Sequence, residues 1–246
     1  MEIRLDKYLA DMGIGSRSQV KQYIRKKQIL VNGNRPTGPE QKITPDTDTV
    51  SFQGQDIGYT RYEYYLFYKP GGCVSAVTDR IHKTVLDYFP KNRRKGLFPV
   101  GRLDLDTEGL LLITNDGTLA HNLLAPGKHV PKTYYAEVSG HVTEDDVEQF
   151  SQGLDIGEAR LTRPAELNLL PENHPEISRI TLTITEGKFH QVKRMFEAVG
   201  KKVLYLKRIS MGSLELDDSL LPGEYRLLTP EELQTITEHT GPSRKG

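Results

Sequence analysis

The first 55 residues carry the apolar pattern of two short helices followed by two short strands. Apolar side chains of the first predicted helix recur at i, i+3, i+4 and i+7, as Leu5, Tyr8, Leu9 and Met12. Gly13 ends that helix, and Ser16 is a suitable N-cap for the second helix. Short strands are predicted at residues 29–31 and 49–52. Together these elements indicate a small N-terminal domain over residues 1–55.

A second, larger domain is predicted over residues 62–240. Residues 56–61 are polar and contain a glycine, which predicts a linker, and residues 241–246 read as a tail. Strands are predicted at 64–68, 109–114, 134–138 and 180–185, and helices at 118–124, 144–152, 189–199 and 231–239. Strands interspersed with helices indicate an α+β fold whose sheet is mixed or antiparallel.

Basic residues gather in patches, although 33 basic and 33 acidic residues leave the chain with no net charge. Residues 12–39 contain basic but no acidic side chains, and the second predicted helix spaces three of them four positions apart. Residues 91–95 and 187–208 form two further basic patches. One such patch is equally compatible with a solvated helix face, but three favour a polyanionic partner. The candidate RNA-binding residues are Arg17, Lys21, Arg25, Lys26, Arg93 and Arg94.

Several kinds of chemistry are disfavoured by what the sequence lacks. A single cysteine excludes an internal disulfide framework and a cysteine-based zinc site, and the seven histidines are scattered. No phosphate-binding loop, dinucleotide fingerprint, zinc-protease motif or serine-hydrolase elbow is present. No apolar run is long enough to span a membrane, and the charged N-terminus does not resemble a secretory signal. We therefore expect a soluble, cytoplasmic protein that uses neither a metal nor a cofactor.

Residues 101–109 are the densest candidate for chemistry, with three carboxylates and an arginine between two glycines. A solvated turn before the apolar strand that follows would explain the same pattern. Asp104 and Asp106 could suggest a glycosidase pair, but residues at i and i+2 of a strand lie side by side on one face. They could not readily flank a glycosidic bond from two sides. One working carboxylate is the simpler interpretation.

Two parts of the chain resemble known families. The segments 4–9, 16–18 and 31–33 resemble the alpha-L RNA-binding domain. Gly101-Arg102-Leu103-Asp104 resembles the catalytic motif of pseudouridine synthases, in the branch named for the ribosomal small subunit enzyme. Segments 69–72, 132–134 and 186–196 match other motifs of that family in the right order. The resemblance covers nearly the whole chain and implies a catalytic domain on a mixed, mainly antiparallel sheet with flanking helices.

The resemblance implies a cofactor-free isomerisation of uridine and assigns three catalytic residues. Asp104 matches the catalytic aspartate, which acts on the sugar as a nucleophile or as a base. Tyr134 matches the tyrosine that stacks on the base and removes a proton from it. Lys193 matches the basic residue that pairs with the aspartate, where an adjacent cation favours the ionised carboxylate.

Three further residues are candidates for substrate binding. Val192 matches the apolar residue that lines the uracil pocket. Arg102 is a candidate for phosphate contact or base displacement, although a structural ion pair is an equal alternative. Arg194 is the neighbour that could be confused with Lys193, and because adjacent helical residues point about 100° apart, only one of the two can face the site.

Residues 105–108 and 190–196 resemble the small-subunit branch of the family, which implies small-subunit ribosomal RNA as the substrate. Large-subunit RNA is the alternative substrate. Two other functions are alternatives. A non-catalytic RNA-binding assembly factor on the same fold would lack the three candidate catalytic residues. A nucleoside glycosidase would differ in its product, because it releases free base. We expect a monomer that acts on ribosomal RNA or on a ribosomal subunit assembly intermediate.

Overall fold

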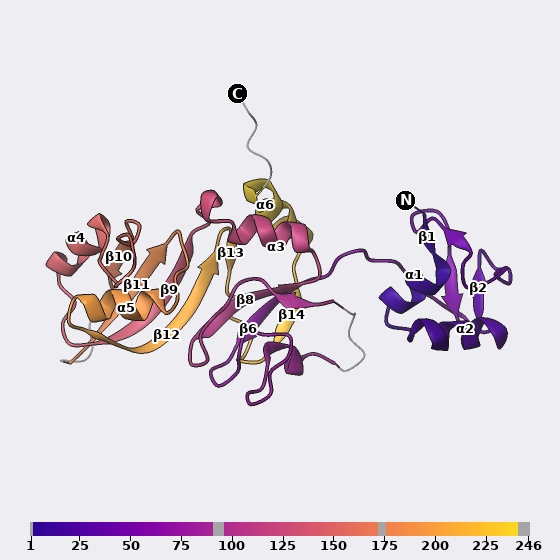
Figure 1. Ribbon diagram of the computed structural model, residues 1–246, viewed down its shortest axis with the longest axis horizontal. Helices are drawn as coiled ribbons and strands as arrows, with labels where there is room; N and C mark the ends of the chain where they lie inside the picture. The colour runs from indigo at the N-terminus through magenta and orange to yellow at the C-terminus, as the bar shows by residue number, and fades with distance from the viewer. Residues whose placement is uncertain (1, 91–95, 172–175, 241–246) are drawn as a thin grey trace, which may run out of the picture. The chain divides into compact units, whose positions relative to one another are not determined.

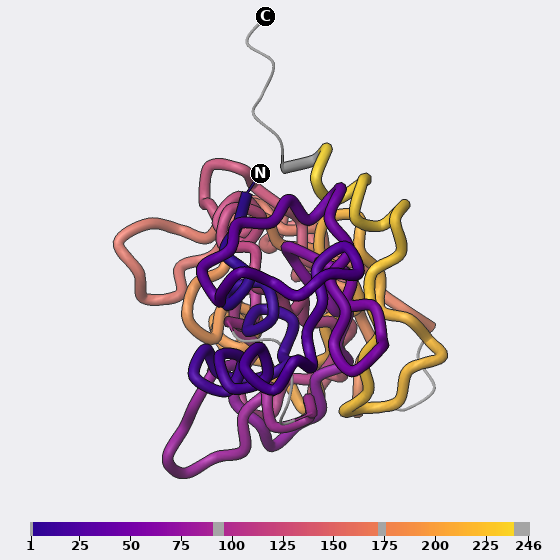
Figure 2. Tube along the Cα trace, turned by 90° about the vertical axis from the view of Figure 1, so that its right-hand side faces the viewer, coloured from indigo at the N-terminus to yellow at the C-terminus, as the bar shows by residue number. Residues whose placement is uncertain are grey.

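The computed structural model describes residues 2–90, 96–171 and 176–240. The chain divides into two compact units, one formed by Met1–Glu63 with Phe89–Leu97 and the other by Tyr64–Tyr88 with Phe98–Gly246. The path of the chain through both units can be followed from indigo to yellow in Figure 2. Within the described ranges, no helix has the length and apolar character that crossing a membrane would require.

The N-terminal unit has two helices and short strands around one apolar core. Its elements are β1 (Ile3–Arg4), α1 (Leu5–Asp11), α2 (Arg17–Arg25), β2 (Ile29–Val31), β3 (Lys42–Ile43), β4 (Val50–Phe52) and β5 (Gln55–Asp56). The Ser16 hydroxyl accepts from the Gln19 amide while the Gln19 side chain accepts from the Ser16 amide, a capping box that fixes the start of α2. The two helices and the two strands predicted from the sequence correspond to α1, α2, β2 and β4, and all four are confirmed.

The segment predicted as a linker contributes to this unit at its beginning. Gln55–Asp56 pair with β4 as strand β5. Beyond them, Ile57 and Tyr59 pack against the apolar core, and the Tyr8 hydroxyl donates to the Ile57 carbonyl. The difference has a simple cause, because Ile57 and Tyr59 are large apolar side chains within an otherwise polar segment and become partly buried against the core.

The second unit is built on a nine-stranded sheet, of which seven strands follow the order β10-β11-β9-β12-β8-β6-β14 (Figure 1). Short strands β7 and β13 pair with β8 and β12. The bounds are β6 (Tyr64–Lys69), β7 (Phe98–Pro99), β8 (Glu108–Thr114), β9 (Lys132–Ser139), β10 (Glu166–Leu169), β11 (Ile177–Ile184), β12 (Lys202–Met211), β13 (Leu214–Glu215) and β14 (Tyr225–Leu227). Among the described strand pairs of this sheet, only β8 with β12 is parallel, so the predicted mixed, mainly antiparallel sheet is confirmed.

Helices flank the two halves of this sheet. They are α3 (Gly117–Leu124), α4 (Glu144–Gln152), α5 (Gln191–Ala198) and α6 (Pro230–Thr240), with short 3-10 turns at Val85–Tyr88 and Pro126–Lys128. In Figure 1, α4 and α5 lie along the half containing β10, β11 and β9, whereas α3 and α6 lie together beside β8 and β13. Phe150 of α4 and Phe196 of α5 join in the first group, with ring centroids 4.9 Å apart. The four predicted helices are thus confirmed.

The parallel pair β8–β12 depends on a glycine. Gly109, the glycine that ends the segment 101–109, has φ +101°, a conformation that L side chains rarely adopt. A Cβ at this position would lie 2.2 Å from the carbonyl oxygen of Arg208. The absence of a side chain therefore lets β12 approach the strand that follows the catalytic motif.

Strand β12 is the longest strand of the sheet, and the sequence pattern did not predict it. Its N-terminal half has consecutive apolar residues rather than an alternating pattern. Two register irregularities, between Val203 and Tyr205 and between Arg208 and Ser210, also interrupt the period of two. Pairing with β9 and β8 therefore defines this strand more than its local sequence does.

Candidate active site

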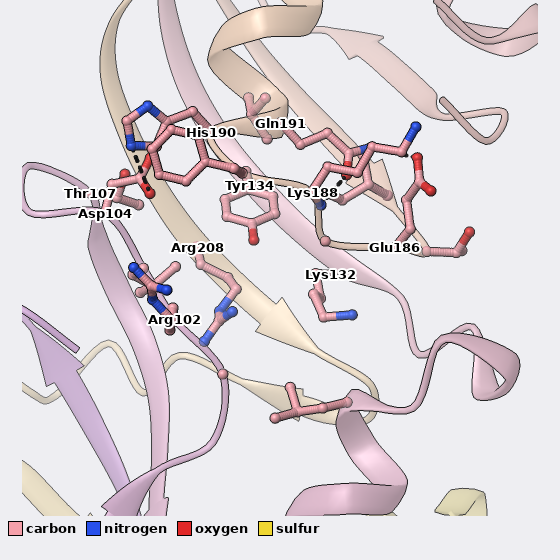
Figure 3. Close-up of a pocket in the computed structure, with 18 of the residues that line it drawn as sticks. Arg102, Asp104, Thr107, Lys132, Tyr134, Glu186, Lys188, His190, Gln191 and Arg208 are labelled. Carbon is pink, nitrogen blue, oxygen red and sulfur yellow. Dashed lines mark hydrogen bonds and ion pairs between the residues drawn. The ribbon is translucent and has the colours of Figure 1, made fainter. Parts of the chain in front are cut away.

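A cavity of about 540 Å³ opens on the sheet of the second unit (Figure 3). It is formed by the loop before β8, the N-terminal end of β9, the turn from β11 into α5, and part of β12. Of the six residues predicted for catalysis and substrate binding, five line it: Arg102, Asp104, Tyr134, Val192 and Lys193. The fold thus brings together residues that lie up to 91 positions apart in the sequence.

Buried Lys69 fastens the loop that carries Asp104. Its Nζ donates to backbone carbonyl oxygens of Thr107 at 2.8 Å, Asp104 at 3.0 Å and Pro70 at 3.1 Å. The side chain has no exposed surface, and burial lowers the pKa of its amino group, an effect that nearby Asp104 and Asp106 partly oppose. The ammonium group of this lysine therefore fixes the backbone at the candidate catalytic aspartate.

Hydrogen bonds from Gly72 and Ser75 hold the same loop to the segment after β6. The Gly72 amide donates to the Leu105 carbonyl at 2.8 Å. The Ser75 hydroxyl donates to the Leu103 carbonyl and accepts from the Leu103 amide, both at 2.9 Å. Asp104 and Asp106 thus lie in a fastened loop and turn, rather than on the strand that follows.

The Asp104 carboxylate lies beside two groups at the start of α5. Lys193 Nζ is 3.5 Å from Asp104 Oδ2, and His190 Nε2 is 3.6 Å from Asp104 Oδ1 (Figure 3). Lys193 also donates to Asp106 Oδ1 at 2.6 Å, so the lysine is shared between the two aspartates. The Asp104 side chain is 25% exposed and that of Asp106 72% exposed. The hydrogen bond from Lys193 lowers the pKa of Asp106.

Tyr134 and Val192 supply the apolar surface of the cavity. Tyr134 belongs to the buried face of β9, where buried and partly exposed residues alternate along the strand. Val192 lies in the first turn of α5 and is buried. An aromatic ring and a branched apolar side chain can together hold a flat base.

The structure does not place Arg194 among the residues that line the cavity, so its role in substrate binding stays a prediction. Its guanidinium donates to Glu158 Oε1 at 2.8 Å, to the Phe189 carbonyl at 3.2 Å and to the Ile156 carbonyl. The physical reason is the helical rotation of about 100° per residue, which turns Arg194 away when Lys193 faces Asp104.

The turn that enters α5 is held by its own hydrogen bonds. The Gln191 amide group donates to Glu186 Oε1 at 2.9 Å and its oxygen accepts from the Lys188 amide at 2.8 Å. His190 has φ +49° and stacks on Phe189, with ring centroids 3.7 Å apart. Phe189 is 67% exposed, so an aromatic surface lies at the margin of the cavity.

Sequence reasoning missed two buried basic residues of the cavity, Lys132 and Arg208. Both line it and both are buried. Lys132 was noted only as part of the tyrosine motif, and Arg208 only as one charge in a basic patch. The available signal was weak, because a cation in a strand is usually exposed and the pairing of β12 with β9 is not visible in the sequence.

The predicted RNA-binding residues outside the cavity fall in two groups. Arg17, Lys21, Arg25 and Lys26 are exposed on or directly after α2. Arg93 and Arg94 lie outside the described residues. Arg102 is exposed at the cavity, where a nucleotide could reach it.

Comparison with known proteins matches both units. Residues 63–198 match the model of the RNA pseudouridylate synthase family, and residues 3–48 match the S4 domain. An uncharacterized RNA pseudouridine synthase of Bacillus subtilis (strain 168) is 44% identical over 96% of this chain and 99% of its own length. Ribosomal small subunit pseudouridine synthase A of Escherichia coli (strain K12) is 37% identical over 95% of this chain and 100% of its own.

A solved structure extends the agreement to three dimensions. A crystal structure of a pseudouridylate synthase aligns with a TM-score of 0.67 at 35% sequence identity, covering 95% of this chain and 99% of that one. Because the family model covers more than half of the chain and the relatives align over nearly all of it, this chain belongs to the RNA pseudouridine synthases, in the family of ribosomal small subunit pseudouridine synthase A.

Proposed function

We propose that the protein converts one uridine of small-subunit ribosomal RNA to pseudouridine in the cavity around Asp104, as a monomer and without a cofactor. The observation that carries the proposal is the position of the Asp104 carboxylate, which lines the cavity with Tyr134 and lies 3.5 Å from Lys193. Relatives named for the ribosomal small subunit support this RNA as the substrate. Either naked RNA or an assembly intermediate would present it.

The reaction requires one bond to be exchanged for another within the same nucleotide. The bond between ribose C1′ and uracil N1 breaks, the base turns, and a bond between C1′ and C5 forms. The proton lost from C5 is balanced by the proton gained at N1, so composition does not change. In this proposal Asp104 acts on the sugar, either by attacking C1′ or by taking a proton from C2′, and Lys193 provides a positive charge beside it.

The rest of the cavity would hold the displaced base. A uridine in a duplex must leave the stack before its sugar and base can react, at a cost of a few kcal/mol. Stacking on Tyr134 would offset about 1–3 kcal/mol of that cost. In this proposal Tyr134 also removes the proton from C5, and Val192 closes the apolar side of the pocket.

The proposal is tested first by Asp104→Asn, which keeps the shape of the side chain and removes its charge. We expect turnover to fall by at least about 10³-fold while RNA binding stays within several-fold of the wild type. Asp145→Asn is the matched control, because Asp145 is exposed on α4 and outside the cavity. Pseudouridine formation by the Asp104 variant at more than a trace would contradict the assignment.

The substrate and the cofactor requirement need separate measurements. Pseudouridine should be missing at one position of small-subunit ribosomal RNA in cells without this gene; a loss confined to large-subunit RNA would refute that substrate. Activity on RNA should persist after dialysis against a chelator. A loss that zinc or magnesium restores, on a short RNA that needs no metal to fold, would contradict the cofactor-free reaction.

A further inference from the structure

Lys132 and Arg208 form a pair of buried cations that the proposed chemistry does not use. Both line the cavity, with only 9% and 2% of their surfaces exposed. Arg208 of β12 is in register with Tyr134 of β9, and Lys132 precedes Tyr134 by two residues on the same buried face of the strand. In Figure 3 the two cationic side chains flank the hydroxyl end of Tyr134.

The hydrogen bonds of this pair leave its charge uncompensated. Lys132 Nζ donates to the Val130 carbonyl and Arg208 Nε to the Leu110 carbonyl, each at 2.8 Å, and both acceptors are neutral. Arg208 Nη2 is buried and has no hydrogen-bond partner in the part of the chain that the structure describes. Buried donors are nearly always satisfied, so this nitrogen indicates a partner that binds from the cavity.

The carboxylates that line the cavity are engaged with other groups. Asp104 lies beside Lys193 and His190. Glu186 accepts from the Arg163 amide and from the Gln191 side chain, each at 2.9 Å. No carboxylate of the described residues lies within ion-pair distance of either buried cation, so the compensating anion must come from a ligand.

The two cations also act on each other. Burial, followed by the charge of Arg208, lowers the pKa of Lys132 to about 8. Two like charges that are both buried and act on each other destabilise the protein in the absence of an anion. The fold retains both, which indicates that an anion is present when the site works.

We propose that Lys132 and Arg208 together bind a phosphodiester group of the RNA directly adjacent to the target uridine. The inference rests on the RNA substrate that the family implies, but not on which RNA is modified. A guanidinium and an ammonium are well suited to one phosphate, the first by paired hydrogen bonds and the second as a point charge. A uracil carbonyl is neutral and would leave both charges uncompensated. Phosphate held here and base stacked on Tyr134 would fix the nucleotide at two points.

The test compares two small probes with the full-length protein. One probe is uridine, and the other is uridine carrying a methyl phosphodiester at both its 3′ and 5′ oxygens. Binding constants are measured by NMR titration. We expect the wild type to bind the diester at least about tenfold more tightly than the nucleoside, as charge-assisted hydrogen bonds would produce. Equal binding of the two probes by the wild type would overturn the proposal without any variant.

Two variants then assign the effect to the pair. Lys132→Met and Arg208→Gln should each remove most of the preference for the diester while the affinity for uridine stays within about twofold. Arg179→Gln is the matched control, because Arg179 pairs with Glu137 on the opposite face of the sheet. Circular dichroism and thermal melting establish that each variant is folded. Lys132→Met is the milder change, because Lys132 is 9% exposed whereas Arg208 is 2% exposed.

Each remaining outcome is decisive. A folded Lys132 variant that keeps the full preference would refute the site. If the variants weaken the binding of both probes equally, the pair recognises uracil and the phosphodiester site is refuted. Pseudouridine formation on ribosomal RNA is assayed separately. A protein that prefers the diester but modifies no ribosomal uridine would overturn the proposed substrate and leave the phosphate site standing.

Discussion

Replacement of Lys69 by methionine tests how the loop that carries Asp104 is held. The substitution keeps a flexible apolar stem of similar length and removes an ammonium group that has no exposed surface. In the wild type this group donates to carbonyls of Thr107, Asp104, Pro70 and, at 3.4 Å, Leu105. An ammonium group has three protons, so at most three of the four interactions are strong at one time.

The expected loss of stability follows from two opposing contributions. A hydrogen bond from a charged group contributes about 1.5–3 kcal/mol, so three bonds would give about 4.5–9 kcal/mol. Removing the charge also relieves its burial, which costs several kcal/mol and which the lowered pKa of Lys69 reflects. We therefore expect the free energy of unfolding to fall by about 2–4 kcal/mol, which lowers the melting temperature by roughly 5–15 °C in a chain of this size.

The activity should fall by a free energy similar to the loss of stability. Three of the four carbonyls belong to residues 104–107, so their release frees the backbone at Asp104. A displacement of about 1 Å at a catalytic group costs roughly 10²-fold in rate. We expect kcat to fall by at least about 100-fold at a temperature where the variant is fully folded.

Melting curves and single-turnover pseudouridine formation measure the two effects. Lys83→Met is the matched control, because Lys83 is exposed in the same unit and its ammonium group lies over the face of the Tyr88 ring. A Lys69 variant with wild-type melting temperature and wild-type kcat would refute the reasoning. A variant that loses stability but keeps its rate would show that the loop holds Asp104 without the lysine.

Two further perturbations test the close approach of β12 to Gly109 and the predicted RNA-binding residues of α2. Gly109→Ala should lower the free energy of unfolding by more than about 3 kcal/mol, because its Cβ would lie 2.2 Å from a carbonyl oxygen of β12. Gly117→Ala, which has open space, should be nearly neutral in the same melting assay, and similar melting of the two would contradict the close approach. Joint replacement of Arg17, Lys21 and Arg25 by alanine should weaken RNA binding and flatten its log–log salt slope by about 0.7–0.9 for each lost phosphate contact. KM should rise far more than kcat falls, and unchanged binding with a collapsed kcat would place this face in the catalytic machinery.

Local elements and the candidate catalytic residues could be predicted from the sequence. The helical spacing in residues 5–12 and the cap at Ser16 are short-range signals, and the structure reproduces both elements. The catalytic motif and the tyrosine motif are contiguous in the sequence, so Asp104 and Tyr134 could be singled out before any fold was known. Both line one cavity because the sheet joins the strands that carry or follow them.

The rotation of α5 about its axis decided which of two adjacent cations faces the cavity. Lys193 turns toward the aspartates and Arg194 toward Glu158. The sequence could state that only one of them faces the site, because adjacent helical residues diverge by about 100°. Which one does so depends on the packing of the buried face of α5, which includes Val192 and Met195.

Long-range strand pairing decided the rest of the site. Arg208 reaches the cavity because β12 pairs with β9 and lies in register with Gly109 of β8, an arrangement with no local signal in the sequence. Lys69 fixes the catalytic loop because β6 ends beside residues 104–107, which lie some 35 positions further along the chain. Patterns of period 2 and 3.6 report which face of an element is buried, whereas the partner that buries it is set only when distant segments pack together.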